Sequence, residues 1–496
     1  MKHLKRIILF LVFMVSSGVL FASEADLKIP DLHEGHYPYF FNLTAWQLLF
    51  FGAWIIVGTL GISLFLFTKI KKLQAHKSML NVADTIYQTC RTYLIQQGKF
   101  LAILFGIVSI AIIFYLIMAH QGEAGAESSI PLFLTIVIVL FFSIIGIGGA
   151  YAVAWYGVRV NTYANARTAF ASLRKRPWDV VNIPLQAGIS IGLFLISLEL
   201  VMMVVILLFV PREIVGYCFL GFAIGESLGA SALRIAGGIF TKIADIGSDL
   251  MKIVFQVKED DPRNPGVIAD CTGDNAGDSI GPTADGFETY GVTGVALISF
   301  ITLAIADVHL QAKLIVWIFG MRFLMDIFSG ISYFINQAIS KKKYGKLLEF
   351  DFEEPLTRLI WIAAISCISI SYIMSYFLIG DLPHGLWWKL ATIISCGTLA
   401  AVLIPEFTKV FTSSKSKHVR EIVTASKEGG SSLTILSGIV AGNFSAYWIN
   451  PVNRTNVDCL FYQQHAWYGP DSVCKYFCLW SGGFRVSLHG AGYHCR

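Results

Sequence analysis

Long apolar stretches recur through most of this chain and are separated by short polar segments. Each stretch is 18 to 28 residues long, which is the length that an α-helix needs to cross the hydrocarbon core of a bilayer. They lie near 46–68, 98–118, 131–155, 183–210, 217–240, 287–305, 313–337, 355–379, 386–408 and 432–449. The pattern predicts an all-α fold, a polytopic transmembrane bundle of about ten spanning helices.

The first 22 residues form a separate segment. Lys2, Lys5 and Arg6 precede an apolar run that ends at the small pair Ala22 and Ser23. This layout predicts a secretory signal peptide, and an uncleaved extra helix is the alternative. With either interpretation, the polar stretch 24–44 lies outside the cytoplasm, and the helical domain runs from 23 to 449.

Composition and charge agree with a membrane protein. Hydrophobic residues make up 55% of the 496, charged residues 14%, and the mean hydropathy is +0.63, which excludes an ordinary soluble domain. The net charge of +5 is spread over loops, so nothing predicts nucleic-acid binding. Basic segments at 69–72, 167–176, 341–343 and 415–420 alternate with loops poor in Lys and Arg. The positive-inside rule therefore predicts a multi-pass protein of the cell inner membrane, with the segment 241–285 facing the cytoplasm.

Charged residues gather at helical spacing between 234 and 288. One helix face carries Lys242, Asp245 and Asp249, and a second stripe carries Asp270, Asp274, Asp278, Asp285 and Glu288. Side by side, these carboxylates would repel one another unless a cation lay among them. Hard oxygen ligands of this kind suit Mg²⁺, which keeps several waters and binds phosphate oxygens.

A run of acidic residues is usually a solvated face, and three observations count against that interpretation here. Asp285 and Glu288 directly abut an apolar run, where ionisable groups are costly. Glycines recur every four residues at 273, 277 and 281, which permits close helix contact. A helix from 217 to about 255 would be ~58 Å long, so it must project beyond a ~30 Å hydrocarbon core.

A lysine beside several Mg²⁺-binding carboxylates is a phosphate-handling arrangement, because both neutralise phosphoryl oxygens in a transition state. The sequence contains no GxxxxGK[ST] loop, so it does not support a nucleotide site of that type. A small, highly charged phosphate compound bound through metals fits better than ATP.

Four ordered motifs in this region resemble the membrane-integral pyrophosphatases, ion pumps that are driven by pyrophosphate. They are RIAGGIFTKIADIGSD at 234–249, EDDPRNP at 259–265, VIAD with GDNAGD at 267–278, and ADGFETY at 284–290. Weaker likeness extends from about 46 to 448, through NARTA at 165–169 and GNFSAYW at 442–448.

The resemblance implies a role for each matching position. Lys242 would contact pyrophosphate, Asp245, Asp249 and Asp274 would hold Mg²⁺, and Asp270 would support that metal shell. Asp278 would polarise the attacking water as a general base. Arg234, Asp285 and Glu288 would form an ion gate, ~22 Å along the helix from Asp270 to Asp285. Pro282 lies between the two parts and could kink or interrupt the helix.

The resemblance leaves several properties open. It implies transport of Na⁺ and/or H⁺, because Glu288 is compatible with both ions, and the residues that report K⁺ activation lie in a second half of the family fold. It also implies a homodimer in lipid. Cys271 stands where the family usually has Asn. A non-enzymatic Mg²⁺-binding membrane protein or transporter fragment remains the alternative function.

Residues 450–496 change character abruptly. They contain four of the nine cysteines, together with three histidines, and contain no apolar spanning run. A zinc-binding tail is one interpretation, although the cysteine spacing is not that of a zinc knuckle. The preferred interpretation is a tail that is translated out of frame from about 449–450. Reading 465–496 one nucleotide later can give an apolar, glycine-punctuated sequence that resembles the family's continuation.

Overall fold

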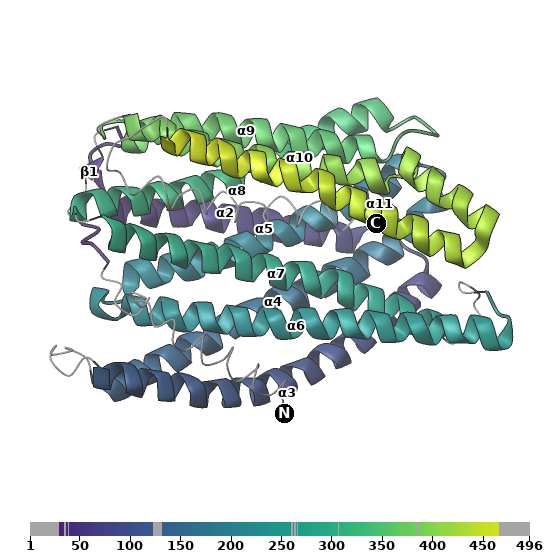
Figure 1. Ribbon diagram of the computed structural model, residues 1–496, viewed down its shortest axis with the longest axis horizontal. Coiled ribbons are helices and arrows are strands. Elements are labelled where there is room, and N and C mark those ends of the chain that lie inside the picture. The colour runs from purple at the N-terminus through teal and green to yellow at the C-terminus, as the bar shows by residue number, and fades with distance from the viewer. Residues whose placement is uncertain are drawn as a thin grey trace.

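Ten long helices make up nearly all of the computed structural model, which describes residues 29–33, 36–37, 39–122, 131–258, 261, 264, 266–305, 307–382 and 385–465. In chain order the helices are α2 (Ala45–Lys72), α3 (Lys77–Gly122), α4 (Leu132–Ser172), α5 (Pro177–Phe209), α6 (Arg212–Phe255), α7 (Gly266–Ala304), α8 (Val308–Tyr344), α9 (Glu353–Ile379), α10 (Leu386–Thr412) and α11 (Lys417–His465). They run side by side as a bundle, with α3 at one edge and α9, α10 and α11 at the other (Figure 1).

The predicted all-α membrane bundle is confirmed. Every predicted apolar run falls on one of these helices. Within the described residues, nine helical stretches are long and apolar enough to cross a membrane, and the last of them, Leu386–Trp448, contains α10 and the part of α11 up to Trp448. The predicted signal segment, 1–22, lies outside the described residues, as do residues 466–496.

A small hairpin fixes where the first helix starts. Strands β1 (His36–Tyr37) and β2 (Leu43–Thr44) pair antiparallel, and Phe41 and Asn42 turn the chain with φ of 52° and 57°. Thr44 then caps α2: its Oγ1 accepts a bond from the Gln47 backbone N–H at 3.2 Å, and Gln47 Oε1 accepts one from the Thr44 N–H at 3.0 Å. This reciprocal capping satisfies two backbone donors at the helix start.

Because successive helices alternate in direction, the basic segments and the acidic segment between α6 and α7 lie at one end of the bundle. Contacts between helix ends and between loops support this placement. Arg167 donates to the Lys71 carbonyl at 2.8 Å, which joins the ends of α4 and α2. Lys415, between α10 and α11, pairs with Asp351, between α8 and α9, and this hydrogen bond holds the pKa of Asp351 below its ordinary value.

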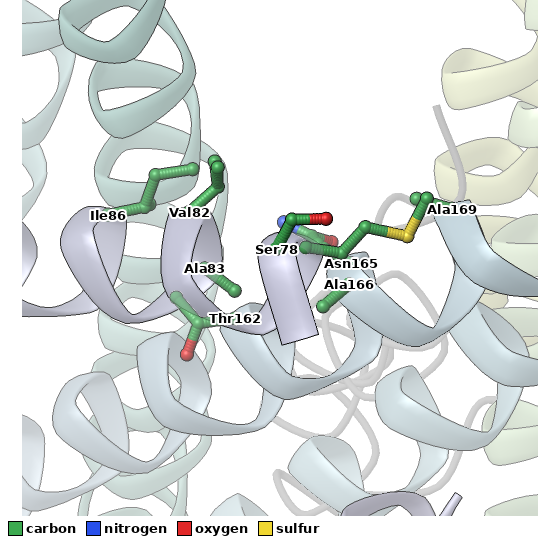
Figure 2. Close-up of a pocket in the computed structure, with 9 residues that line it drawn as sticks. Ser78, Val82, Ala83, Ile86, Thr162, Asn165, Ala166 and Ala169 are labelled. Carbon is green, nitrogen blue, oxygen red and sulfur yellow. The ribbon is translucent and has the colours of Figure 1, made fainter. Parts of the chain in front are cut away.

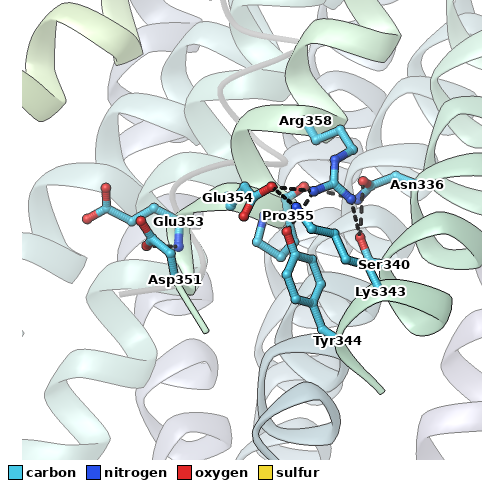
Figure 3. A network of polar contacts seen from close by, with 9 residues as sticks. All are labelled: Asn336, Ser340, Lys343, Tyr344, Asp351, Glu353, Glu354, Pro355 and Arg358. Carbon is cyan, nitrogen blue, oxygen red and sulfur yellow. Dashed lines mark hydrogen bonds and ion pairs between the residues drawn. The ribbon is translucent and has the colours of Figure 1, made fainter. Parts of the chain in front are cut away.

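A polar network at the same end connects α8 to α9 (Figure 3). The Glu354 carboxylate accepts bonds from Lys343 at 2.5 Å and from Arg358 at 2.8 Å. Arg358 also donates to the Tyr344 hydroxyl at 2.7 Å. Since all four residues come from the end of α8 or the start of α9, the network fixes the turn between these helices.

Glycines bring α4 and α6 into backbone contact. A methyl group added at Gly221 would overlap the Val139 carbonyl, and one added at Gly225 would overlap the Ser143 carbonyl. On the facing helix, one added at Gly146 would overlap the Phe222 carbonyl. Small residues spaced four apart permit such close approach in membranes, where packing replaces the hydrophobic drive between helices. This crossing positions α6 beside the main core, which α2, α5, α7 and α8 largely supply.

The two helices that carry the charged stripes are long and unbroken. α6 has 44 residues, hence a length of ~66 Å, and ends at Phe255, so it projects beyond a ~30 Å hydrocarbon core as predicted. α7 continues through Pro282, so this proline does not interrupt it. α11, in contrast, changes direction at Gly429 and Gly430, just before its apolar part begins.

Candidate functional site

The charged stripes meet because α6 and α7 pack closely and antiparallel. Gly273 of α7 lies against Ala244, where an added Cβ would come within 2.9 Å of the Ala244 Cβ, and Gly277 lies against the Thr241 hydroxyl. Thr241 also donates to the Gly273 carbonyl at 2.7 Å. Two of the three predicted glycine contacts are therefore made on this helix pair. Gly281 has open space where its Cβ would be.

The predicted substrate and metal residues lie around this contact. Lys242 Nζ lies 3.2 Å from Asp245 Oδ2 on α6. Asp274, across on α7, interacts electrostatically with Asp278, Asp245 and Lys242. These four side chains are therefore brought together from two helices.

The other two predicted metal residues flank this group. Asp249 lies one turn beyond Asp245 on α6, with its Oδ1 4.0 Å from Lys252 Nζ. Asp270 lies one turn before Asp274 on α7 and is partly buried. The six acidic and basic positions thus form two facing rows along α6 and α7.

Within the described residues, no three His, Cys, Asp or Glu side chains converge on a single point that could hold a metal. The carboxylates are instead distributed along the two rows. Mg²⁺ usually binds one or two protein carboxylates and completes its octahedron with waters and phosphate oxygens. The donor chemistry therefore fits Mg²⁺ bound together with a phosphate compound, and it does not provide an all-protein metal cage.

The three predicted gate residues lie farther along the same helix pair. Arg234 of α6 forms an ion pair with Asp285 of α7. Ser227 of α6 donates to Glu288 Oε1 at 2.7 Å. The predicted gate residues therefore lie on the same seam between α6 and α7, displaced toward the middle of the bundle from the acidic rows.

Helix α4 supports α7 from the other side. Asn165 donates to the Asn275 side chain at 2.8 Å, and Asn275 donates to the Cys271 carbonyl at 2.7 Å. Asn161 donates to Ser279 at 2.6 Å. These amide contacts position the face of α7 next to Asp274 and Asp278. The Cys271 side chain itself is exposed.

A group of buried charges was not predicted from the sequence. Glu199 of α5, Glu226 of α6, and Arg322 and Asp326 of α8 are 0–2% exposed. Arg322 donates to the Tyr290 carbonyl at 3.0 Å, and Ser197 donates to Asp326 at 3.4 Å. The signal was present in the sequence, because each of these residues interrupts an otherwise apolar spanning run, where ionisable groups are usually functional.

A separate cavity of about 320 Å³ lies between α3 and α4 (Figure 2). Its lining is mainly apolar: Ser78, Met79, Val82, Ala83, Ile86, Thr162, Asn165, Ala166 and Ala169. It contains no cationic side chain among these residues, so it does not suit a highly charged phosphate compound.

Comparison with known proteins gives consistent matches. Residues 57–462 match the family model described as inorganic H+ pyrophosphatase. The chain is 59% identical over 381 residues to the K(+)-insensitive pyrophosphate-energized proton pump of Chlorobaculum tepidum, covering 77% of this chain and 50% of that protein. It is 30% identical over 375 residues to the pump of the same name from Methanosarcina mazei, covering 75% and 50%.

A third relative bears a different ion in its name. The chain is 29% identical over 304 residues to a putative K(+)-stimulated pyrophosphate-energized sodium pump of Clostridium tetani, covering 59% of this chain and 41% of that protein. The chain spans about half the length of the curated relatives it matches. The family model, however, covers most of the chain, from before the first acidic row to within α11. This chain belongs to the inorganic H+ pyrophosphatase family.

Proposed function

We propose that this chain supplies the pyrophosphate-binding and gate-forming helices of a pump that couples hydrolysis of pyrophosphate to ion transport. The observation that carries the proposal is the pairing of α6 with α7. It places Lys242 and Asp245 opposite Asp274 and Asp278, with Arg234 and Asp285 farther along the same seam. Family membership supplies the substrate class.

The residues of the two rows would have different roles in the reaction. Asp245, Asp249 and Asp274 would hold Mg²⁺, with Asp270 supporting them, and the metal would neutralise phosphoryl oxygens when bound. Lys242 adds a positive charge, and its exposed ammonium can reach a ligand between the rows. Asp278 orients and deprotonates a water as general base, since it lies next to Asp274 on the same helix face.

Transport follows from the position of the gate. Substrate binding between the rows would shift α6 against α7, and the same seam contains the Arg234–Asp285 pair and the Ser227–Glu288 bond. We propose H⁺ as the ion and independence from K⁺, because the relative with 59% identity is named for both properties. Na⁺ is the second candidate, in line with the Clostridium tetani relative.

We place the acidic rows on the cytoplasmic side of a cell inner membrane. The support is the cluster of basic residues at the same end of the bundle, which the positive-inside rule assigns to the cytoplasm. A homodimer in lipid stays a prediction from family resemblance.

We also propose that the C-terminal tail is read out of frame. We place the change of frame at about 449–450, and the support is the abrupt change of composition there, since 450–496 contains four of the nine cysteines and no apolar spanning run. Sequencing the gene across codons 440–470 tests this directly. An uninterrupted frame with no apolar alternative would overturn it.

Binding of pyrophosphate is the first test of the proposed function. In membranes that contain this chain, Lys242→Ala should weaken Mg²⁺-dependent binding of radiolabelled pyrophosphate by about 10- to 100-fold, because a charge-assisted hydrogen bond contributes roughly 1.5–3 kcal/mol. Lys77→Ala, an exposed lysine at the start of α3, is the matched control and should bind as the wild type does. Equal pyrophosphate binding by the wild type, Lys242→Ala and Lys77→Ala would contradict the assignment of Lys242 to pyrophosphate binding. Mg²⁺ binding without any pyrophosphate binding would favour the non-enzymatic alternative.

The gate gives a second prediction. Glu288→Ala removes the carboxylate that Ser227 contacts, while the acidic rows about two turns or more away stay intact. Pyrophosphate-driven acidification of vesicles should therefore fall at least about 10-fold, whereas pyrophosphate binding should change less than about 3-fold. Glu213→Ala, at the exposed start of α6, serves as the control. Unchanged pumping by the Glu288 variant would remove it from the gate.

A further inference from the structure

Two glutamates face each other in the interior of the bundle. Glu199 of α5 and Glu226 of α6 are both 0% exposed. Their carboxylate oxygens converge on the Cα of Gly291 in α7, where a methyl group would collide with Glu226 Oε2 and with Glu199 Oε1. The absence of a side chain at Gly291 therefore makes the space that the two carboxyl groups share.

The two carboxyl groups interact electrostatically with each other. In the described part of the chain, no N–H or O–H group donates a hydrogen bond to any of their four oxygens. Two ionised carboxylates have no proton to share, so in that state all four oxygens would be buried acceptors without a donor. A single proton between them would provide the missing donor.

The nearby cation does not fill this role. Arg322 of α8 interacts electrostatically with both glutamates, but its two Nη groups donate elsewhere and its Nε–H has no hydrogen-bond partner among the described residues. Nη1 donates to the Tyr290 carbonyl at 3.0 Å and Nη2 lies 3.4 Å from the Thr293 hydroxyl, while the guanidinium stacks over the Tyr290 ring at 4.2 Å. Arg322 can therefore balance one negative charge of the pair without ion-pairing to either carboxylate.

The other ionisable groups near the pair are acids, so they supply no second positive charge. Glu226 interacts with Glu288, which accepts from Ser227, and Glu199 interacts with Tyr290. Asp326, on α8, has its own hydroxyl contact from Ser197. Two adjacent anions with one guanidinium would leave a net negative charge in a low-dielectric interior, which costs several kcal/mol per ion.

We propose that Glu199 and Glu226 form a proton-binding site in which the two carboxyl groups share one proton. The site lies beside Glu288, since Glu226 directly precedes Ser227 on α6 and Gly291 lies about one helical turn after Glu288 on α7. Its role as a station for the transported proton rests on the proposed function. The presence of the shared proton does not rest on that function. The presence of the proton and its transport can therefore be tested separately.

The experiment is infrared spectroscopy of the purified full chain at neutral pH. A protonated carboxylic acid has a carbonyl stretching band that an ionised carboxylate lacks. Labelling glutamate with ¹³C shifts the band of a protonated glutamate and leaves any band of Asp326 in place. Labelling requires no substitution, so it tests the proposal even if a variant does not fold. The wild-type chain should show one such glutamate band, and adding NaCl should not remove it.

Single substitutions then test the sharing. Glu226→Gln and Glu199→Gln should each abolish the whole band, because the new amide donates to the remaining carboxylate and Arg322 balances its charge. Glu213→Gln, on the exposed start of α6, should leave the band unchanged. Loss of half the band in each variant would mean two separate protons and would overturn the sharing. A band unaffected by either substitution would overturn the site, and a band removed by NaCl would reassign it to Na⁺.

A vesicle assay separates this proposal from the proposed function. If the chain pumps protons with pyrophosphate, Glu226→Gln should lower transport by at least about 10-fold and leave pyrophosphate binding within about 3-fold. A wild-type chain that shows the band but no pyrophosphate-driven transport would refute the function and retain the proton site. Transport by the variant at the wild-type rate would exclude the pair from the proton route.

Discussion

Replacing Asp278 by Asn should lower the rate of pyrophosphate hydrolysis by about 100- to 10,000-fold, which is the usual contribution of a general base. The substitution keeps the size and hydrogen-bonding reach of the side chain but removes its ability to take a proton from water. Because Asp278 is proposed to act on water and not on pyrophosphate itself, binding of Mg²⁺ and pyrophosphate should change less than about 5-fold.

The measurement is phosphate release from pyrophosphate in membranes, with kcat and KM determined separately. Asp84→Asn is the matched control, since Asp84 is an exposed aspartate on α3 at the same end of the bundle. A loss that appears only in KM would reassign Asp278 to metal or substrate binding. Hydrolysis by the variant at the wild-type rate would exclude it from the proton transfer.

Gly225→Ala should destabilise the bundle by about 1–3 kcal/mol or more, the cost of overpacking a tight contact. The added methyl group would overlap the Ser143 carbonyl of α4, and a backbone atom cannot rotate away as a flexible side chain can. Relief would require α4 and α6 to separate, which would also loosen the neighbouring contacts at Gly221 and Gly146.

Gly238→Ala is the control for this prediction. Gly238 lies on the same helix, and its added Cβ would meet no atom within 4 Å. Alanine there should stabilise the helix by about 0.5–1 kcal/mol, because glycine loses more backbone freedom on folding. Unfolding of both variants in detergent, followed by circular dichroism, would compare them. Equal stability of the two variants would show that the α4–α6 crossing is looser than the structure indicates.

Local sequence patterns predicted much of the fold. Each apolar run corresponds to a helix. Backbone N–H and C=O groups without hydrogen bonds are costly in lipid, and a helix satisfies them within the segment itself. The end of α6 near 255 was also predicted, since the apolar and charged periodicity stops there. The ends of α4 and α8, in contrast, extend well past their apolar runs, because polar residues can continue a helix outside the bilayer.

Part of the candidate site was also predictable, because the helical period can be identified from neighbouring residues. Lys242 and Asp245 on one helix and Asp274 and Asp278 on the next occur at a period that places each set on one face. The glycines at 273 and 277 indicated a close contact, and the structure supplies the partner, Thr241 with its neighbour Ala244. The sequence did not indicate that Gly281 is left out of this contact.

The sequence by itself thus determined the helical membrane fold and the two charged rows, because hydropathy and helical period are properties of neighbouring residues. Only the tertiary structure decided the register that pairs Arg234 with Asp285 and Ser227 with Glu288. It also decided that Glu199 and Glu226 meet at Gly291. In a run that is apolar on every face, nothing local indicates which face turns inward, and a contact between three helices depends on residues far apart in the chain.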